Sequence, residues 1–506
     1  MSNTFGNYAI IVYGGTFSGV AAAENAAKLL PDESILLINP SPGWGGVSGV
    51  GGQNAWDTRN WQHGDRSMTP QGGSFRQWYR TSGQAYDPEA IQDQLRESVA
   101  GRENVDVLDF WDAVDVVASD DGRGLSGVQV TPLKRVEGET KPSGQQVIVE
   151  GRQFVDASES GRLARLAGVP LSVGRTDWAN DSRQMAATLM FQMTDVDWRT
   201  ISQARSPNGQ QTYGQATAPS SDRRLFWGGH WYVKNAAAIQ EFNDSFPRFR
   251  IKALNAAESG DGRFWFNALL IYDVDGRYDA RERGKILPAT PDHSPWDVDR
   301  ARERANEVVA TDAFETAMRA FPGLERASFV PDDRGEPTTA DALYLRETVH
   351  ARGDDGFAIT RDDVVDAGTG PNDGADADYY DTRIGLAYYW LNNNGYVSST
   401  PSDAAEFYAT ENPVYVPFEA LTTSHCDNLL VSGYAASVSS EAWFEMRLTP
   451  NLCVLGDGAG VGAAVASEHG VDPIDFGDEE IEELQTILAD EVGAILEKDP
   501  DAGTVV

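Results

Sequence analysis

The sequence predicts an α/β protein whose core is a parallel sheet, and three observations near the N-terminus support this. An apolar run over residues 8–13 ends in a glycine-rich turn over residues 14–19. An alanine-rich stretch over residues 20–30 follows, and a second apolar run over residues 34–38 ends at Asn39-Pro40. A strand, a glycine turn, a helix and a second strand form the βαβ unit with which Rossmann-like dinucleotide-binding domains begin.

The glycine turn has the features that a pyrophosphate site requires. Gly14 would let the strand turn sharply, and Gly19 would let the helix pack close to the strand. The helix N-terminus would present N–H groups and a partial positive charge. Thr16 stands where a second glycine is usual, and Asn39 replaces the usual strand-end acid. Because asparagine can both donate and accept hydrogen bonds, we expect adenosine binding, although an ordinary strand-turn-helix without a ligand is the alternative.

Segments further along the chain follow the order found in one family. They are Val-Tyr-Gly-Gly-Thr-Phe-Ser-Gly-Val at 12–20, Gly-Trp-Gly-Gly at 43–46, Phe-Val-Asp-Ala-Ser-Glu-Ser-Gly-Arg-Leu at 154–163, Leu-Tyr-Leu-Arg-Glu-Thr at 343–348, Asp-Asn-Leu-Leu-Val-Ser-Gly at 427–433 and Leu-Gly-Asp-Gly-Ala-Gly at 455–460. Together they resemble the FAD-dependent oxidoreductases of the glutathione-reductase-like superfamily. The resemblance extends over residues 8–496.

The resemblance implies that FAD is the cofactor and suggests which residues hold it. Asp457 would bind the ribityl or phosphate region, and a helix beginning near Gly460 would face the flavin N1 and C2 carbonyl and stabilise the anionic reduced flavin. A merely structural turn is the alternative. The expected cofactor-binding residues are Gly14, Gly15, Thr16, Phe17, Ser18, Gly19, Asn39, Pro40, Gly45, Gly46, Val114, Ala157, Ser158, Gly456, Asp457, Gly460 and Val461. We expect FAD to be non-covalent, a link through His63 being a minor alternative.

The chain divides into a split flavin domain and an inserted α+β domain. We expect residues 1–175 to form the first part of the FAD-binding domain and residues 176–412 a substrate or cap domain. Residues 413–475 would complete the FAD-binding domain, and residues 476–506 would add a C-terminal helix and tail.

Apolar patterning predicts the elements within these parts. In the flavin domain we expect a parallel strand at 105–114 beside the adenine, an antiparallel hairpin at 124–130 and 145–150, a strand at 451–455 and a helix at 481–496. In the insert we expect strands at 188–193, 225–233 and 264–272, a helical segment at 298–320 and a loop at 362–381.

The acid–base group is harder to predict than the cofactor site. His230 and His350 are our first candidates, with His63 a third, and Arg346 and Arg447 are candidate anchors for the substrate or the flavin. Each has a structural alternative, because an isolated histidine is often simply hydrogen-bonded and Arg346 could pair with Glu347. Tryptophans near these positions suit a ring-shaped substrate such as a sugar but are equally usual in a core. These are Trp44, Trp56, Trp61, Trp227 and Trp231.

Composition narrows the class of protein. There are 77 acidic residues against 41 basic ones, a net charge of −36, and only seven lysines. We interpret this as adaptation to high salt, which screens the repulsion between acidic surfaces. The charge argues against nucleic acid as a partner, and no apolar run is long enough to cross a membrane. Two cysteines cannot form a metal cluster or a redox pair. Without a signal pattern, we expect a cytoplasmic protein with no metal.

Three functions therefore compete. The first is an FAD-dependent oxidoreductase that transfers a hydride between the flavin N5 and a small-molecule substrate. The second is a flavin monooxygenase, whose usual Gly-Asp-Ala-Ala-His segment is matched only by Gly-Asp-Gly-Ala-Gly at 456–460. The third is a non-catalytic flavin- or nucleotide-binding protein. Because residues 176–412 contain no second glycine fingerprint, we expect electrons to pass to oxygen or a separate carrier rather than to a stable NAD(P)H site.

Overall fold

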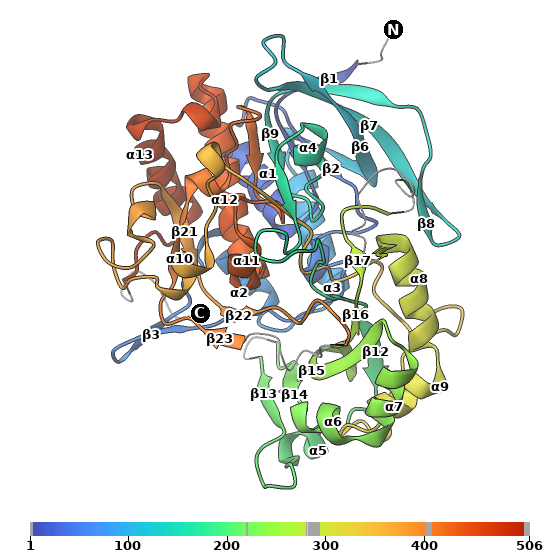
Figure 1. The fold of residues 1–506 in the computed structure, drawn as a ribbon. Helices are drawn as coiled ribbons and strands as arrows, with labels where there is room; N and C mark the ends of the chain where they lie inside the picture. The colour runs from blue at the N-terminus through green and yellow to red at the C-terminus, as the bar shows by residue number, and fades with distance from the viewer. Residues whose placement is uncertain (1–3, 219–220, 280, 282–293, 400–406, 500–506) are drawn as a thin grey trace.

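The computed structural model describes residues 4–218, 221–279, 281, 294–399 and 407–499, and it has the expected α/β architecture (Figure 1). The N-terminal βαβ unit is confirmed. Strands β1 and β2 pair in parallel, and the helix between them is almost wholly buried. These elements are β1 (Thr4–Tyr13), α1 (Phe17–Leu29) and β2 (Ile35–Asn39).

The first large sheet joins a parallel and an antiparallel part. Its order is β5-β2-β1-β9-β7-β6, with β25 also on β9 and β8 also on β7. Strand β9 connects the two parts, since its N-terminal half pairs antiparallel with β7 and its C-terminal half pairs parallel with β25. The expected pairing of 124–130 with 145–150 is therefore confirmed. The strands are β5 (Val105–Asp109), β6 (Trp111–Ala118), β7 (Leu125–Val136), β8 (Glu139–Pro142), β9 (Val147–Asp156) and β25 (Leu429–Val431).

Apolar side chains cover both faces of this sheet. Alternate residues of β1, such as Ile10 and Ile11, enter separate cores on opposite faces. On one face the sheet packs against α1, α3 (Pro88–Ala100) and α12 (Thr449–His469). Helix α12 packs closely along α1 and thereby brings the C-terminal part of the chain back to the N-terminal glycine turn. None of the described helices is both long and apolar enough to cross a membrane.

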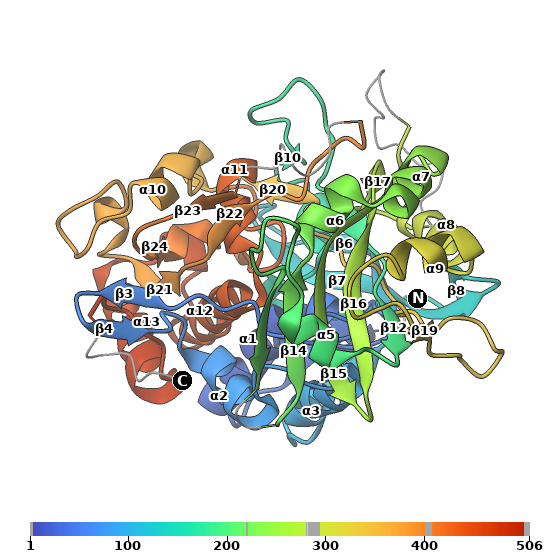
Figure 2. The ribbon, with the colours of Figure 1, turned by 90° about the horizontal axis from the view of Figure 1, so that it is seen from below.

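The second large sheet lies within the part of the chain expected to form the insert, and it is antiparallel. Its order is β13-β14-β15-β16-β12-β19, with β11 on β16, and Figure 2 shows the long strands side by side. The expected strand at 225–233 is too long, because β14 ends at Gly228 and His230 begins a helix after Gly229 (φ +88°). The strands are β11 (Ala187–Thr188), β12 (Phe191–Thr194), β13 (Tyr213–Thr217), β14 (Arg224–Gly228), β15 (Phe249–Gly260), β16 (Arg263–Ile271) and β19 (Ser328–Phe329).

Short helices and hairpins complete the fold. The insert carries α5 (Trp198–Gln203), α6 (His230–Asn235), α7 (Ala237–Ser245), α8 (Val298–Val309), α9 (Asp312–Met318), β17 (Val274–Asp275) and β18 (Trp296–Asp297). Elements before it are η1 (Gly46–Ser48), β3 (Trp61–His63), β4 (Arg66–Met68), α2 (Gly73–Ser82), α4 (Arg162–Leu166) and β10 (Leu171–Val173).

The remaining elements lie between the second sheet and the C-terminus. The segment 362–381, expected as a loop, contains short helical turns at both ends. The elements are β20 (Val349–Ala351), η3 (Asp354–Gly356), α10 (Arg361–Val365), η4 (Ala377–Tyr379), β21 (Arg383–Ala387), β22 (Trp390–Asn392), β23 (Phe407–Ala409), β24 (Val414–Pro417), η6 (Phe418–Ala420), α11 (Ser440–Met446), η7 (Pro473–Asp475), α13 (Asp478–Ile487) and the π-helical turn η8 (Leu488–Val492).

Candidate flavin and substrate site

The glycine turn between β1 and α1 is tightly closed. Gly14 has φ +126°, and a Cβ there would lie 2.8 Å from the backbone carbonyl of Ala157. A Cβ on Gly19 would lie 1.9 Å from the Gly14 carbonyl oxygen. Thr16 is the N-cap of α1: its hydroxyl accepts a hydrogen bond from the Gly19 N–H (3.1 Å) and donates one to the Ala157 carbonyl (2.8 Å). The threonine therefore holds the turn together, while the first N–H groups of α1 are left without helical acceptors.

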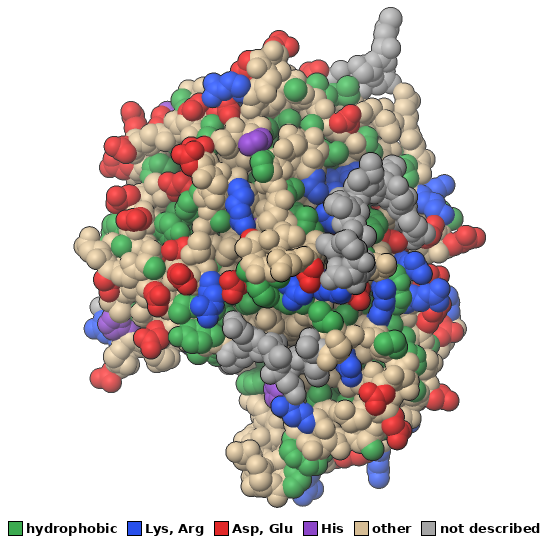
Figure 3. All heavy atoms as spheres, viewed as in Figure 1, with side chains coloured by type: hydrophobic (Ala, Val, Ile, Leu, Met, Phe, Trp, Pro, Cys, Tyr) green, Lys and Arg blue, Asp and Glu red, His purple; other side chains and the backbone are tan. Residues whose placement is uncertain are grey.

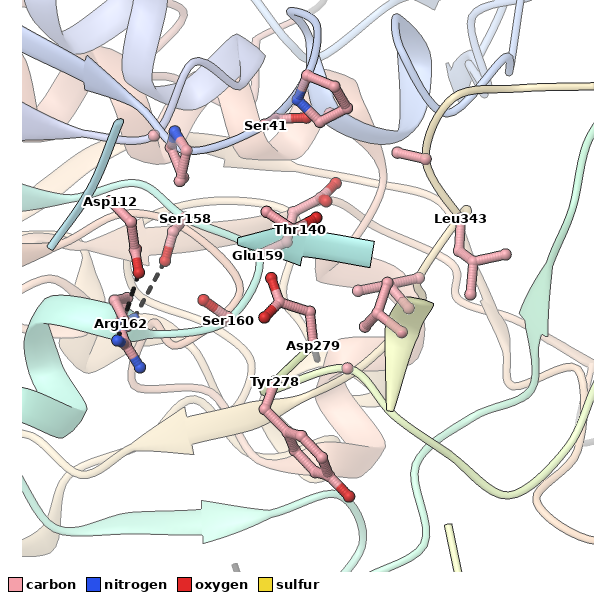
Figure 4. A pocket seen from close by; sticks show the side chains of 18 of the residues that line it. Ser41, Asp112, Thr140, Ser158, Glu159, Ser160, Arg162, Tyr278, Asp279 and Leu343 are labelled. Carbon is pink, nitrogen blue, oxygen red and sulfur yellow. Dashed lines mark hydrogen bonds and ion pairs between the residues drawn. The ribbon is translucent and has the colours of Figure 1, made fainter. Parts of the chain in front are cut away.

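A cleft opens beside this turn. It holds about 990 Å³ of space not filled by protein, part of it open to solvent. Figure 4 shows Asp112, Ser158 and Arg162 together on one side of the cleft and Leu343 on the other, with the Tyr278 ring directed away from them. The expected cofactor residues that line it are Gly14, Gly15, Thr16, Asn39, Pro40, Gly46 and Ser158.

The charges around the cleft differ from those of the whole chain. Six arginines and five carboxylates line it, in a chain of net charge −36. Some of these arginines are neutralised by acids; Arg162, for example, lies 3.4 Å from Asp112. Figure 3 shows the same contrast at the surface, where acidic side chains are scattered and basic ones gather near α8 and β8. A locally balanced lining suits a phosphate-bearing ligand better than the acidic surface elsewhere.

Two details of the expected adenosine site need revision. Val114 does not line the cleft. It lies at an irregularity in the β6–β7 pairing, and the β6 side chain that lines the cleft is Asp112. Asn39 lines the cleft, but its amide group already donates to Gly43 and Asp109, which leaves its carbonyl oxygen as the group with spare hydrogen-bonding capacity.

A second, smaller cavity of about 260 Å³ adjoins the cleft. It shares Thr16 and Glu159 with the cleft and reaches Tyr434, Thr449 and Leu452. The expected residues Phe17, Ser18, Gly45 and Ala157 line it. The two spaces together connect the α1 N-terminus with the α12 N-terminus.

Glu159 stands between the two spaces. Its Oε1 accepts a hydrogen bond from the Val47 N–H at 2.9 Å. Burial raises the pKa of Glu159 to about 7, only partly offset by that hydrogen bond. The sequence reasoning did not name this residue as part of the site, although it lies within the segment 154–163 on which the family resemblance rests.

The expectation that a strand at 451–455 leads into a helix near Gly460 and Val461 is wrong. Helix α12 begins at Thr449, and this whole segment lies inside it. The glycines serve helix packing: a Cβ on Gly456 would lie 2.3 Å from the Ser18 carbonyl oxygen, and one on Gly460 would lie 2.4 Å from that of Ala22. They allow α12 to lie against α1 and form no turn.

Asp457 has a structural role in this arrangement. It is buried and accepts hydrogen bonds from Asn25 (2.8 Å) and from the hydroxyl and N–H of Ser74 at the start of α2. Burial raises the pKa of Asp457 to about 6. Among the described residues, Asp457 lines neither the cleft nor the cavity.

The helix end that faces the cavity is the true N-terminus of α12. Thr449 and Leu452 line the cavity, and the Thr449 hydroxyl lies 2.6 Å from the Ser48 hydroxyl. The sequence carried a signal for this start, because Pro450 suits the first turn of a helix. The partial positive charge of this 21-residue helix is directed towards the cavity.

Next to this helix end lies a group of buried and half-buried polar side chains, which we call the interior charge cluster. Arg447, which precedes α12, donates to the Tyr344 hydroxyl (3.1 Å) and the Asn392 carbonyl (3.1 Å). The Arg346 guanidinium lies 4.4 Å from the Tyr344 ring centre. The other members are Asp57, Lys252 and Tyr389, and the Tyr389 hydroxyl donates a hydrogen bond to Asp57.

The cluster members shift one another's protonation. Burial lowers the pKa of Lys252 to about 7, and the charges of Arg346 and Arg447 act in the same direction while Asp57 opposes them. Burial likewise lowers the pKa of Arg346 to about 10 and raises that of Asp57. Groups that can gain or lose a proton near neutrality, placed beside a cavity, are typical of catalytic sites.

Comparison with known proteins identifies the family of this chain. A family model described as "FAD dependent oxidoreductase" matches residues 9–488. The chain belongs to this family of FAD-dependent oxidoreductases. It is thus a flavoenzyme with FAD as its cofactor.

Solved structures of flavoenzymes resemble this oxidoreductase at low identity. The myxobacterial chondrochloren halogenase CndH is 11% identical with a TM-score of 0.39, over 96% of this chain and 80% of that chain. The p-nitrophenol 4-monooxygenase PnpA of Pseudomonas putida is 9% identical with a TM-score of 0.35, over 96% and 86%. None of the curated proteins matches this oxidoreductase.

The geometry fits FAD. A glycine turn with no room for a Cβ and a capped helix N-terminus provide a pyrophosphate cradle. The cleft provides space for adenosine on one side of that cradle, and the cavity leads from its other side towards α12. FMN has no adenosine to fill the cleft.

The three histidines lie elsewhere. His230 and His63 are exposed, on α6 and on the β3–β4 hairpin, and His350 is fully buried on β20 with its Nε2 3.1 Å from Glu347 Oε1. Among the described residues that line the cleft or the cavity there is no histidine. Glu347 thus pairs with His350, not with Arg346, which donates to the Ala186 carbonyl and to Asn267. An acid–base role for these histidines stays a prediction.

Proposed function

We propose that this FAD-dependent oxidoreductase transfers a hydride between the flavin N5 and a small organic substrate that lies against the interior charge cluster. The observation that carries the proposal is the arrangement of the cleft, the adjoining cavity that borders it at Thr16 and Glu159, and the α12 N-terminus, which lines that cavity and follows Arg447. Bound FAD supplies the two-electron chemistry. The residues of the chain position the substrate and handle its protons.

The chain offers a distinct group for each task. The α12 N-terminus would stabilise negative charge at the pyrimidine end of the flavin. Lys252 and the Asp57–Tyr389 pair would exchange protons with the substrate, because Lys252 titrates near neutrality. Tyr344 would form an aromatic wall suited to a ring-shaped substrate such as a sugar. We further propose that electrons leave to oxygen or a separate carrier, and that nucleic acid and membranes are not partners.

Anaerobic reduction tests this function. Purified holoenzyme is mixed without oxygen with candidate alcohols, amines and sugars, and flavin absorbance is followed by stopped flow. Bleaching by one compound class supports the proposal, and Lys252→Met should slow it while the exposed Lys141→Met should not.

The alternatives give different results. A monooxygenase would show no bleaching by its substrate and would incorporate oxygen into it once the flavin is reduced by another donor. Rapid bleaching of the flavin by NADH or NADPH would contradict the proposal that electrons pass to oxygen or a separate carrier rather than to a pyridine nucleotide. A protein that purifies with no flavin, either released on denaturation or retained on the denatured chain, would be a non-catalytic nucleotide binder.

A further inference from the structure

The interior charge cluster has an excess of positive charge. It contains Lys252, Arg346 and Arg447 but one carboxylate, Asp57. Several other arginines with little exposed surface have a carboxylate within 3 Å. Examples are Arg277 with Asp275 (2.6 Å), Arg175 with Asp181 (2.5 Å) and Arg224 with Glu258 (2.7 Å).

The guanidinium groups of the cluster are incompletely satisfied. Arg346 and Arg447 are 1% and 4% exposed, and their hydrogen bonds go to carbonyl oxygens, an amide and a hydroxyl. Within the described part of the chain, the Nε atoms of both are buried without a hydrogen-bond partner. A buried cation without a countercharge is strongly destabilising, which indicates that an anion completes this site.

We infer that the cluster binds the carboxylate, or a similar oxyanion, of the substrate. This inference rests on the proposed function and adds the chemical class of the substrate. Lys252 and Asp57 keep some exposed surface, so a ligand can reach the cluster. Lys252 lies on β15 in an irregularity between Ile251 and Asn255, and such bulges redirect side chains near functional sites.

The positions of the three cations indicate which of them would face the substrate anion and which would face the reduced flavin. Arg346 is bonded to Asn267 of β16, and Lys252 belongs to β15, so both lie on the side of the antiparallel sheet. The cavity beside the glycine turn is bordered by Thr449 and Tyr434. Arg447 precedes α12 by two residues, and because the N-terminus of that helix borders the cavity, Arg447 is the cation of the cluster suited to the flavin.

The inference includes a pH dependence. Charged and titratable side chains around Lys252 are Asp57, Arg346, Arg447, Tyr344 and Tyr389. With the pKa of Lys252 at about 7, the ammonium form is present below that pH and lost above it. Anion affinity should therefore fall as the pH rises through 7.

Benzoate and the neutral benzamide are matched probes. Their binding to the holoenzyme is measured between pH 5.5 and 9 by calorimetry and by the flavin difference spectrum, with no turnover required. We expect benzoate to bind at least tenfold more tightly than benzamide at pH 6. Lys252→Met should lose that preference and its pH dependence, Lys252→Arg should keep the preference, and Lys141→Met should match the parent.

Equal binding of benzoate and benzamide, or no binding of either at pH 6, would overturn the inference. So would a Lys252→Met variant that binds benzoate normally while its flavin spectrum changes, because the cluster would then serve the flavin. If a neutral compound bleaches the flavin and benzoate does not bind, the proposed function stands without the inference. If benzoate binds as expected and no compound bleaches the flavin, the anion site stands without the hydride transfer.

Discussion

Replacing Gly14 by alanine tests the pyrophosphate cradle. At φ +126°, a Cβ at position 14 would lie 2.8 Å from the Ala157 carbonyl carbon and oxygen and 2.9 Å from the Ser158 nitrogen. Backbone strain at such φ values costs about 1–3 kcal/mol, and overpacking against rigid atoms costs about 1–3 kcal/mol more. The overlap falls on the cradle itself, so it should appear as weaker FAD binding.

Gly260 offers a matched control. It has φ +134°, and a Cβ there would have nothing within 4 Å. Gly260→Ala should therefore lose stability through strain alone and keep its FAD affinity. Because 1.4 kcal/mol is a factor of ten, the overlap predicts FAD binding weaker by about 5- to 150-fold in Gly14→Ala. Flavin fluorescence titration of the two apoproteins measures this. Equal FAD affinities in the two variants would refute the account of the turn.

Four further predictions concern other parts of the molecule. Gly460→Ala should lower the melting temperature, measured by calorimetry, because its Cβ would lie 2.4 Å from the Ala22 carbonyl oxygen; an unchanged melt would contradict the packing role. FAD affinity should fall as the pH rises through about 7, because ionised Glu159 would repel the pyrophosphate, and titrations of Glu159→Gln should show no such dependence. Burial raises the pKa of Glu445 from 4.5 to about 8, so wild-type stability should decline as the pH rises through that range, and Glu445→Gln should be the more stable protein in denaturant melts at pH 8. With a net charge of −36, the melting temperature should rise from low to molar KCl, and an unchanged melt would remove the salt-adaptation hypothesis.

Local signals explain why the N-terminal unit was predictable from sequence. The conformation of the turn from Gly14 to Gly19 and the helicity of the alanine-rich α1 depend mainly on residues that are close in the chain, so the sequence predicts both. The flavin-side glycines followed from the family resemblance. These segments placed the cleft correctly.

The C-terminal segment shows where local reasoning failed. Gly456 and Gly460 resembled the glycines of a turn. In the structure they are needed because α1, more than 400 residues earlier in the chain, packs too closely to leave room for a Cβ. Ala459, between them, and the alanines that follow Gly460 are compatible with a helix, and only tertiary packing decides how much of the segment is helical.

The interior charge cluster was only partly predictable. Arg346 and Arg447 were candidates from the sequence. Lys252 and Asp57 are far from them in the chain, and the four side chains come together only in the fold, through the β15 irregularity and the position of α11, which directly precedes Arg447. Histidines were the acid–base candidates from the sequence because an unperturbed histidine titrates near neutrality. In this protein burial lowers the pKa of Lys252 to about 7, so that Lys252 titrates near neutrality. The residues next to Lys252 in the sequence do not predict that burial.

A crystal structure of the holoenzyme with FAD tests the central claim most directly. We predict adenosine in the cleft near Asn39, the pyrophosphate at the Gly14–Gly19 turn, and the flavin ring between Thr449 and Arg346. A flavin ring elsewhere, for example in the open groove bordered by Arg59 and Trp390, would contradict the account.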